Sequence, residues 1–277
     1  MAWQTVGHRP VKKLFDTQLA NGIFSHAYLL LGTSGIGKTE LAQEFAHKIT
    51  GGNINSQNLD VVLLDHLVDG GAVAVREALA TISTTPFFAK YKVIVIPYID
   101  QFNLASSNAI LKILEEPASH TIFILTADSS GVLPTIKSRC QVFTLYPLDD
   151  VELAEYAKDQ KLIVDEHMIN FAHGSIKLLK QFSEDKKSFQ KIKEQVESLE
   201  KVAKASNFEK MVAVQTFAEL EADELEVLLK HWMWKLKRNL SQTPQSHKTI
   251  TVILEALQKF SQSMNKKLIL QSVFLNA

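Results

Sequence analysis

The sequence predicts an α/β fold in which a parallel sheet is followed by an all-helical C-terminal half. Five short apolar runs occur in the first half without polar alternation, as expected of strands covered on both faces. These runs are Tyr28–Leu31, Val61–Leu64, Val93–Ile96, Ile122–Leu125 and Val142–Leu145. Helical patterns separate them, and this alternation is typical of βαβ units around a parallel sheet.

The second half of the chain has a different composition. Beyond Pro147, the only proline is Pro244 and the only glycine is Gly174. Because both residue types disfavour helix interiors, their near absence predicts helices throughout. The charged stretch from 184 to 193 is expected to be an exposed helix or a linker, and a second helical block is expected from about residue 207 to the end.

Composition and charge exclude several classes of protein. The 277 residues are 46% apolar and 22% charged, so the chain can bury a core. Lys plus Arg and Asp plus Glu each total 30, which disfavours a protein that grips DNA by itself. Cys140 is the single cysteine and the nine histidines have no metal-ligand spacing, so we expect no disulfide and no zinc. The N-terminal segment lacks a signal-peptide pattern and no run reaches membrane-spanning length, which predicts a cytoplasmic protein without membrane contact.

A phosphate-binding loop follows the first apolar run. Glycines allow backbone N–H groups to surround phosphate, and the next helix, expected to begin near Glu40, presents the positive end of its dipole. Lys38 is expected to contact the β and γ phosphates of ATP, and Thr39 to hold Mg²⁺. The alternative is a glycine-rich turn that binds no ligand. The segment matches GxxxxGK[ST] and consists of Gly32, Thr33, Ser34, Gly35, Ile36, Gly37, Lys38 and Thr39.

The carboxylate that ATP hydrolysis requires is absent from its expected place. A P-loop ATPase needs an acid at the end of a neighbouring strand to hold magnesium and activate water. The candidate strand ends at Ile96 and is followed by Pro97 and Tyr98. The sequence therefore predicts nucleotide binding without efficient hydrolysis.

Two other carboxylates are candidates for that role. Asp100 lies four residues beyond Ile96, up to about 13 Å of extended chain, so we expect it to miss the magnesium. Asp65 follows the run Val61–Leu64, which is expected to lie at the sheet edge, and it can equally be a polar residue that closes a strand.

Three further segments contain recognisable motifs. Residues 103–117 are expected to form an amphipathic helix that Asn103 caps and that ends before Pro117. Its SSNAILKILEEP stretch resembles the S-x-N-A-L-L-K-x-L-E-E-P segment of bacterial clamp loaders and their eukaryotic and archaeal relatives. Residues 138–140, Ser-Arg-Cys, are similar to the SRC motif of that family, and His26-Ala27-Tyr28-Leu29 is also similar. The resemblance covers about residues 1 to 180, in the order and spacing of the family.

The resemblance implies an AAA+ P-loop domain with a helical lid and an all-α collar. It implies that Arg139 is an arginine finger, which reaches the γ-phosphate of ATP on the neighbouring subunit. Without the motif, an arginine before a strand is more simply a surface salt-bridge former. Thr126 matches the sensor 1 position, which faces the γ-phosphate. Lys177 lies where active loaders often place the sensor 2 arginine, and a lysine cannot reproduce the bidentate contact.

Two departures indicate a subunit of the delta-prime type within this family. The ATP-hydrolysing subunit has Asp-Glu after the central strand, where this chain has Pro97 and Tyr98. That subunit also has a four-cysteine zinc module after the P-loop helix, and residues 50–59 of this chain contain no cysteine. Delta-prime subunits commonly lack a catalytic acid and keep the SRC motif.

The family architecture implies a P-loop domain over residues 1–146, a lid over 147–195 and a collar over 200–277. The implied partners are the other clamp-loader subunits of a hetero-pentamer, the sliding clamp, and primer–template DNA through the complex. The implied cofactor is ATP with magnesium, and the chain would assist clamp loading with little or no hydrolysis of its own. The alternatives are an active AAA+ clamp-loader ATPase with an unusual acid, and a separate P-loop enzyme such as a small-molecule kinase. The kinase hypothesis leaves the LEEP and SRC segments unexplained.

Overall fold

The computed structural model of the protein describes residues 3–52, 58–64, 75, 85–128, 131–238, 244–260 and 265–276. The chain forms two compact units. Unit 1 comprises Met1–Leu162 and Gly174–Leu179, and unit 2 comprises Ile163–His173 and Lys180–Ala277. The predicted division into domains at residues 146, 195 and 200 stays a prediction.

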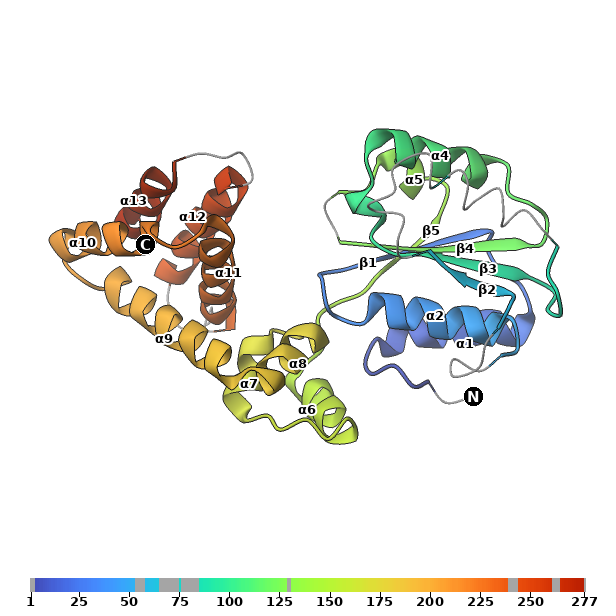
Figure 1. Ribbon diagram of the computed structural model, residues 1–277, viewed down its shortest axis with the longest axis horizontal. Coiled ribbons are helices and arrows are strands. Elements are labelled where there is room, and N and C mark those ends of the chain that lie inside the picture. Colours follow the sequence, from blue (N-terminus) through green and yellow to red (C-terminus); the bar gives the residue numbers. More distant parts are fainter. Residues whose placement is uncertain are drawn as a thin grey trace. The chain divides into compact units, whose positions relative to one another are not determined.

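Unit 1 is built on a five-stranded parallel sheet (Figure 1). Strands β1, β3 and β4 are buried along their whole length, which explains why their sequences show no polar alternation. All five predicted strands are confirmed, and β2 lies at the sheet edge as expected. The strands, in the spatial order β2-β3-β4-β1-β5, are β1 (Ala27–Leu31), β2 (Val61–Leu63), β3 (Lys92–Ile96), β4 (Thr121–Ala127) and β5 (Gln141–Thr144).

Helices cover both faces of this sheet. Figure 1 shows α1 (Arg9–Asn21) and α2 (Lys38–Ile49) on one face, and α4 (Leu104–Glu115) and α5 (Pro134–Lys137) on the other. The side chain of Asn103 accepts a hydrogen bond from Ser106 N–H at 2.8 Å, so the predicted cap of α4 is confirmed. The short 3₁₀ helix η1 (Ile99–Gln101) follows β3, and α6 (Asp150–Asp159) follows β5.

An aromatic cluster fixes α1 and α2 against the sheet. The rings of Phe15 and Phe45 stack with centroids 3.8 Å apart and planes within 3° of parallel. Tyr28 on β1 meets Phe45 edge to face at 5.3 Å. Burial of these rings in one cluster stabilises the position of the helix that follows the P-loop.

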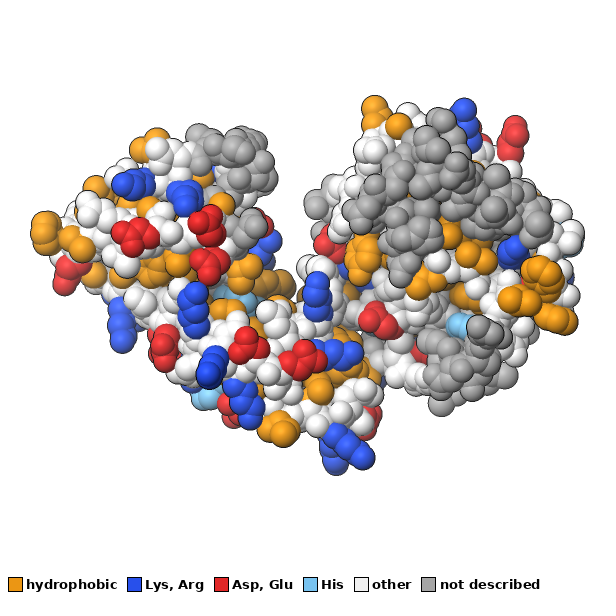
Figure 2. Space-filling view, in the orientation of Figure 1, with side chains coloured by type: hydrophobic (Ala, Val, Ile, Leu, Met, Phe, Trp, Pro, Cys, Tyr) orange, Lys and Arg blue, Asp and Glu red, His pale blue; other side chains and the backbone are white. Residues whose placement is uncertain are grey.

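Unit 2 is helical throughout its described residues. The charged stretch that begins at Glu184 enters the long helix α9, rather than an irregular linker. None of the helices in the described part of the chain combines the length and apolarity needed to cross a bilayer. On the face shown in Figure 2, Lys and Arg side chains are interspersed with Asp and Glu side chains over this unit. The helices are α7 (Glu166–Ala172), the second half of α8 (Ile176–Glu184), α9 (Lys186–Ala203), α10 (Asn207–Ala218), α11 (Ala222–Arg238), α12 (Pro244–Phe260) and α13 (Lys266–Asn276).

Two histidines meet inside unit 2. His173 Nε2 lies 2.9 Å from Nδ1 of His231, and the ring of Trp234 stacks on His173 with centroids 5.6 Å apart. Burial lowers the pKa of His231 to about 4. The folded state therefore holds His231 neutral, whereas the unfolded chain protonates it near its usual pKa of about 6.5.

This difference predicts an acid-labile unit 2. Because the pKa of His231 is depressed in the folded state, its contribution to the free energy of unfolding is fully present above pH 6.5 and is lost as the pH falls toward 4, by roughly 3 kcal/mol. Denaturant unfolding of the wild type and His231→Phe between pH 7 and 4 measures this, and the variant is expected to lose most of the pH slope. His167→Gln, at an exposed position, is the control and should keep the slope. Equal slopes in wild type and His231→Phe would contradict the prediction.

Candidate nucleotide-binding site

The loop between β1 and α2 requires its glycines. Gly35 and Gly37 have φ of 79° and 92°, in the left-handed region that favours glycine. A Cβ atom at Gly32 would lie 2.5 Å from the backbone oxygen of Leu145, so no larger residue fits without moving the backbone. The glycines that the motif contains are thus explained by the geometry of the loop.

The N–H groups of the loop form an anion-binding surface. The ladder of α2 starts with Leu41 N–H donating to Gly37 O at 3.0 Å, so the N–H groups of Lys38, Thr39 and Glu40 precede the first intrahelical bond. Unpaired N–H groups at a helix N-terminus attract negative charge. This part of the site fits the phosphates of a nucleotide.

Lys38 is already surrounded by oxygen atoms. Its ammonium group donates to the backbone oxygens of Gly32 at 2.8 Å and Thr33 at 2.7 Å, and to Oδ1 of Asp128 at 2.8 Å. The Lys38 side chain is only 5% exposed, whereas that of Asp128 is 39% exposed. The predicted phosphate-binding lysine therefore lies in the loop, held there by a carboxylate at the end of β4.

The end of β3 carries no carboxylate next to the loop. Tyr98 follows β3 in the left-handed region, with φ of 55°. Its N–H donates to Oγ1 of Thr126 at 3.4 Å, and Thr126 is fully buried. Thr126 thus contacts the neighbouring strand end, and its predicted contact with the γ-phosphate stays a prediction. Asp65, the other candidate acid, lies outside the described residues.

Asp100 lies in the turn after β3 and contacts the residue that pairs with Lys38. The chain beyond Ile96 is not extended but turns through η1, within the upper bound of about 13 Å, and the expectation that Asp100 misses the magnesium stays a prediction. Oδ2 of Asp100 accepts a hydrogen bond from Asp128 N–H at 3.2 Å. Burial raises the pKa of Asp100, the Asp128 carboxylate raises it further, and the Lys38 ammonium opposes both.

The residues of the site fit phosphate more completely than they fit Mg²⁺. Thr39 lies at the start of α2, where a P-loop hydroxyl can hold the metal of a bound nucleotide. Within the described chain, no three His, Cys, Asp or Glu side chains gather closely enough to hold a metal ion by themselves. Any magnesium would therefore depend on the nucleotide for most of its ligands.

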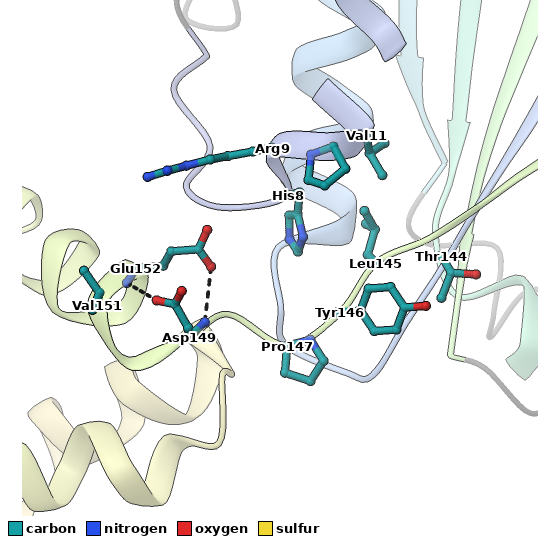
Figure 3. Close-up of a pocket in the computed structure, with 11 residues that line it drawn as sticks. His8, Arg9, Val11, Thr144, Leu145, Tyr146, Pro147, Asp149, Val151 and Glu152 are labelled. Atoms are coloured by element: carbon teal, nitrogen blue, oxygen red, sulfur yellow. Dashed lines mark hydrogen bonds between the residues drawn. The ribbon is translucent and has the colours of Figure 1, made fainter. Parts of the chain in front are cut away.

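A cleft beside the loop is large enough for a nucleoside. Its volume is about 620 Å³, and Figure 3 shows that residues from the start of α1, the end of β5 and the start of α6 line it. His8 on the wall lies with Nε2 2.8 Å from the backbone oxygen of Ile36, and burial lowers the pKa of His8. The neutral imidazole can thus donate Nε2–H to Ile36 and join the cleft to the P-loop. Other residues on the wall are Arg9, Val11, Tyr146, Pro147 and Glu152.

The segment after Gly174 packs on the P-loop within unit 1. Lys177 N–H donates to the backbone oxygen of Gly35 at 3.1 Å, and Oγ of Ser175 donates to the same oxygen at 3.3 Å. A Cβ atom at Gly35 would lie 2.3 Å from Ser175 Oγ, so glycine permits this close approach. The backbone of Lys177 makes the contact, and the predicted sensor 2 role of its side chain stays untested.

Arg139 and the P-loop of its own chain lie at opposite ends of the parallel strands. In the parallel register Gln141 at the start of β5 pairs with Tyr28 on β1, so Arg139 precedes the amino end of β5, whereas the P-loop follows the carboxyl end of β1. Its guanidinium donates to Glu115 Oε1 at 2.7 Å and to the backbone oxygen of Thr135 at 2.9 Å. The site residues predicted from the sequence therefore form two groups. The P-loop and Thr126 lie near the carboxyl ends of the strands, and Arg139 lies near their amino ends.

Sequence reasoning missed three residues of this site: Asp128, His8 and Ser175. Asp128 had a usable signal, because it directly follows a strand that neighbours β1, and the carboxyl ends of parallel strands meet at one edge. His8 and Ser175 contact the loop through residues far apart in the chain, and no local pattern in the sequence marks such contacts.

The known proteins that this chain resembles in sequence are subunits of DNA polymerase III. Residues 71–149 match the family model described as DNA polymerase III, delta subunit. The sequence similarity is to subunits of DNA polymerase III. The subunit tau of Bacillus subtilis (strain 168) is 29% identical over 191 residues, covering 63% of this chain and 33% of that relative. The subunit gamma of Buchnera aphidicola subsp. Acyrthosiphon pisum is 30% identical over 202 residues, covering 62% of this chain and 55% of that relative.

The polymerase III similarity extends to the fold. A DNA polymerase III gamma subunit-related protein from Thermotoga maritima superposes with a TM-score of 0.51 at 17% identity, covering 94% of this chain and 97% of that one. The predicted α/β fold with a parallel sheet is confirmed, and its assignment to the AAA+ class stays a prediction. The chain spans about a third of the tau relative and about half of the gamma relative. The family model describes a delta subunit, whereas these relatives are named tau and gamma. The similarity to polymerase III subunits is therefore not specific to one subunit type.

Proposed function

We propose that this chain is a clamp-loader subunit of the delta-prime type in a bacterial DNA polymerase III. It assists the ATP-dependent loading of a sliding clamp onto primer–template DNA, as one member of a cytoplasmic hetero-pentamer. Its P-loop binds ATP with magnesium and hydrolyses little or none of it. The observation that carries this proposal is the end of β3, where Pro97 and Tyr98 stand in place of a metal-binding and a water-activating acid.

The position of Arg139 supports a role on a neighbouring subunit. The residue is level with the amino ends of the strands, so its guanidinium cannot serve the P-loop of its own chain at the carboxyl ends. An arginine at that edge is available to a nucleotide bound by an adjacent subunit. The bond to Glu115 is a partly exposed ion pair worth about 0–1 kcal/mol, so exchanging it for a phosphate contact costs little.

The helical C-terminal part supports the proposed division into lid and collar. Helices α6 to α8 fall in the proposed lid, residues 147–195, together with the first half of α9. Helices α10 to α13 fall in the proposed collar, residues 200–277, and bury Leu225, Leu229, Trp232 and Phe274. A helical block with its own core is the kind of element through which subunits of a ring associate.

The second candidate function is an active AAA+ ATPase, and Asp100 favours it. Asp100 lies in η1 directly after β3, and the charge of Lys38 lowers its pKa against the larger raising effect of burial. Against this candidate, Oδ2 of Asp100 is engaged by Asp128 N–H. Oδ1 of Asp100 is buried without a hydrogen-bond partner in the described part of the chain, so replacement of Asp100 is the variant that tests this candidate.

Turnover by the isolated chain separates the two functions. We expect the purified protein to bind ATP and to show no phosphate release above that of Lys38→Ala, a variant that removes the P-loop cation. The measurement is phosphate release with Mg²⁺, with and without primed DNA and clamp. Turnover by the wild type that Asp100→Asn abolishes would establish the active ATPase instead.

A further inference from the structure

The pairing of Lys38 with Asp128 has a consequence for ligand binding. An ammonium group has three N–H donors. In this structure two of them go to the backbone oxygens of Gly32 and Thr33, and the third goes to Asp128. A phosphate that contacts Lys38 must therefore replace one of these three acceptors.

Asp128 is the acceptor that can leave. Gly32 and Thr33 belong to the loop itself, so their carbonyls can turn away from the ammonium group only if the loop changes shape. The Asp128 side chain is 39% exposed and can rotate toward solvent, where water solvates the carboxylate. While it remains, its negative charge also repels an approaching phosphate.

The carboxylate is held in place by a second contact. Asp128 directly follows β4, and its N–H donates to Oδ2 of Asp100 at 3.2 Å. This bond fixes the backbone from which the Asp128 side chain reaches Lys38. Asp100 is thus a positioning residue for Asp128, without a contact of its own to the ammonium group among the hydrogen bonds of the described residues.

We infer that Asp128 is an internal counter-ion of Lys38 that nucleotide phosphate must displace, and that it thereby weakens nucleotide binding by this chain. The inference rests on the nucleotide-binding part of the proposed function and adds the residue that regulates it. Neutralising Asp128 replaces a charged acceptor of the Lys38 ammonium by a weaker, uncharged one and removes the repulsion of phosphate.

The test compares the affinity of the full chain and its Asp128→Asn variant for ATP that carries a fluorescent N-methylanthraniloyl group on the ribose. We expect the Kd to fall about tenfold in the variant, both in EDTA and with Mg²⁺. Asp128→Glu keeps the charge and should bind as weakly as the wild type. Glu226→Gln, which removes one carboxylate from the surface ion pair with Lys230, is the matched control and should leave the Kd unchanged.

The outcomes separate the possible roles of Asp128. A Kd that is unchanged in Asp128→Asn would overturn the inference. A Kd that rises in the variant only with Mg²⁺ would also overturn it and would identify Asp128 as a metal ligand. Absence of binding by every variant would overturn it as well, while the role of Arg139 would still be decided by turnover of the assembled loader. Thermal unfolding of each variant confirms that the compared proteins are folded.

Discussion

Replacement of Arg139 by alanine is expected to lower ATP hydrolysis at the neighbouring subunit's site by roughly 10³-fold, because an arginine supplied in trans stabilises the charge of the transition state. The measurement is DNA- and clamp-stimulated phosphate release by the reconstituted loader. Nucleotide binding by this chain should be unchanged, since Arg139 lies near the amino ends of the strands and its own P-loop lies at their carboxyl ends. The loss should therefore appear in turnover of the assembly alone.

Two variants make this experiment specific. Lys137→Ala removes a cation two residues away at the end of α5 and should leave turnover within about twofold, since a general loss of charge is not the cause. Arg139→Lys keeps the charge but loses the bidentate fork, and should recover only part of the activity. Full activity of Arg139→Ala in an assembled loader would contradict the trans role and leave Arg139 as the partner of Glu115.

Replacement of Phe45 by alanine is expected to lower the free energy of unfolding by about 3–5 kcal/mol. Phe45 is fully buried, stacks on Phe15 and meets Tyr28 edge to face, so its removal leaves a cavity between α2 and the sheet. The helix that loses this contact begins at Lys38. The change is measured by a denaturant titration in which the unfolding of unit 1 is monitored.

The control for this substitution is another phenylalanine. Phe88 is 88% exposed, so Phe88→Ala should change the free energy of unfolding by no more than about 0.5 kcal/mol. Similar losses in Phe45→Ala and Phe88→Ala would mean that the aromatic cluster does not hold α2 on the sheet. Normal stability of Phe45→Ala would have the same meaning.

The sheet was predictable from the sequence because its strands are buried on both faces. Runs such as Val93–Ile96 and Ile122–Leu125 are short, apolar and rich in β-branched residues, as strands covered on both faces are. The P-loop was predictable for a different reason, since the close approach of Gly32 to Leu145 and the positive φ of Gly37 admit only glycine. Both are cases in which local geometry restricts the residue type strongly.

The environment of Lys38 could not be predicted in the same way. Asp128 is 90 residues away in the sequence, and the ion pair exists only because β4 lies beside β1. The turn at η1 was not predicted either, and a 3₁₀ turn shortens the path that an extended chain would take. Contacts of this kind depend on strand order and on loop conformation, and neither has a periodic signature in the sequence.

The P-loop and Arg139 lie at opposite ends of the parallel strands, so the two sides of unit 1 that they occupy differ in function. A subunit that receives an arginine on its P-loop side and donates an arginine from the other side joins its neighbours head to tail. Such contacts do not close as a twofold pair. In a row of such subunits, one terminal member donates an arginine while its own nucleotide edge faces no donor. Under the proposed function the chain donates Arg139 and hydrolyses little or no ATP, so it needs no donor of its own and suits that end of the row.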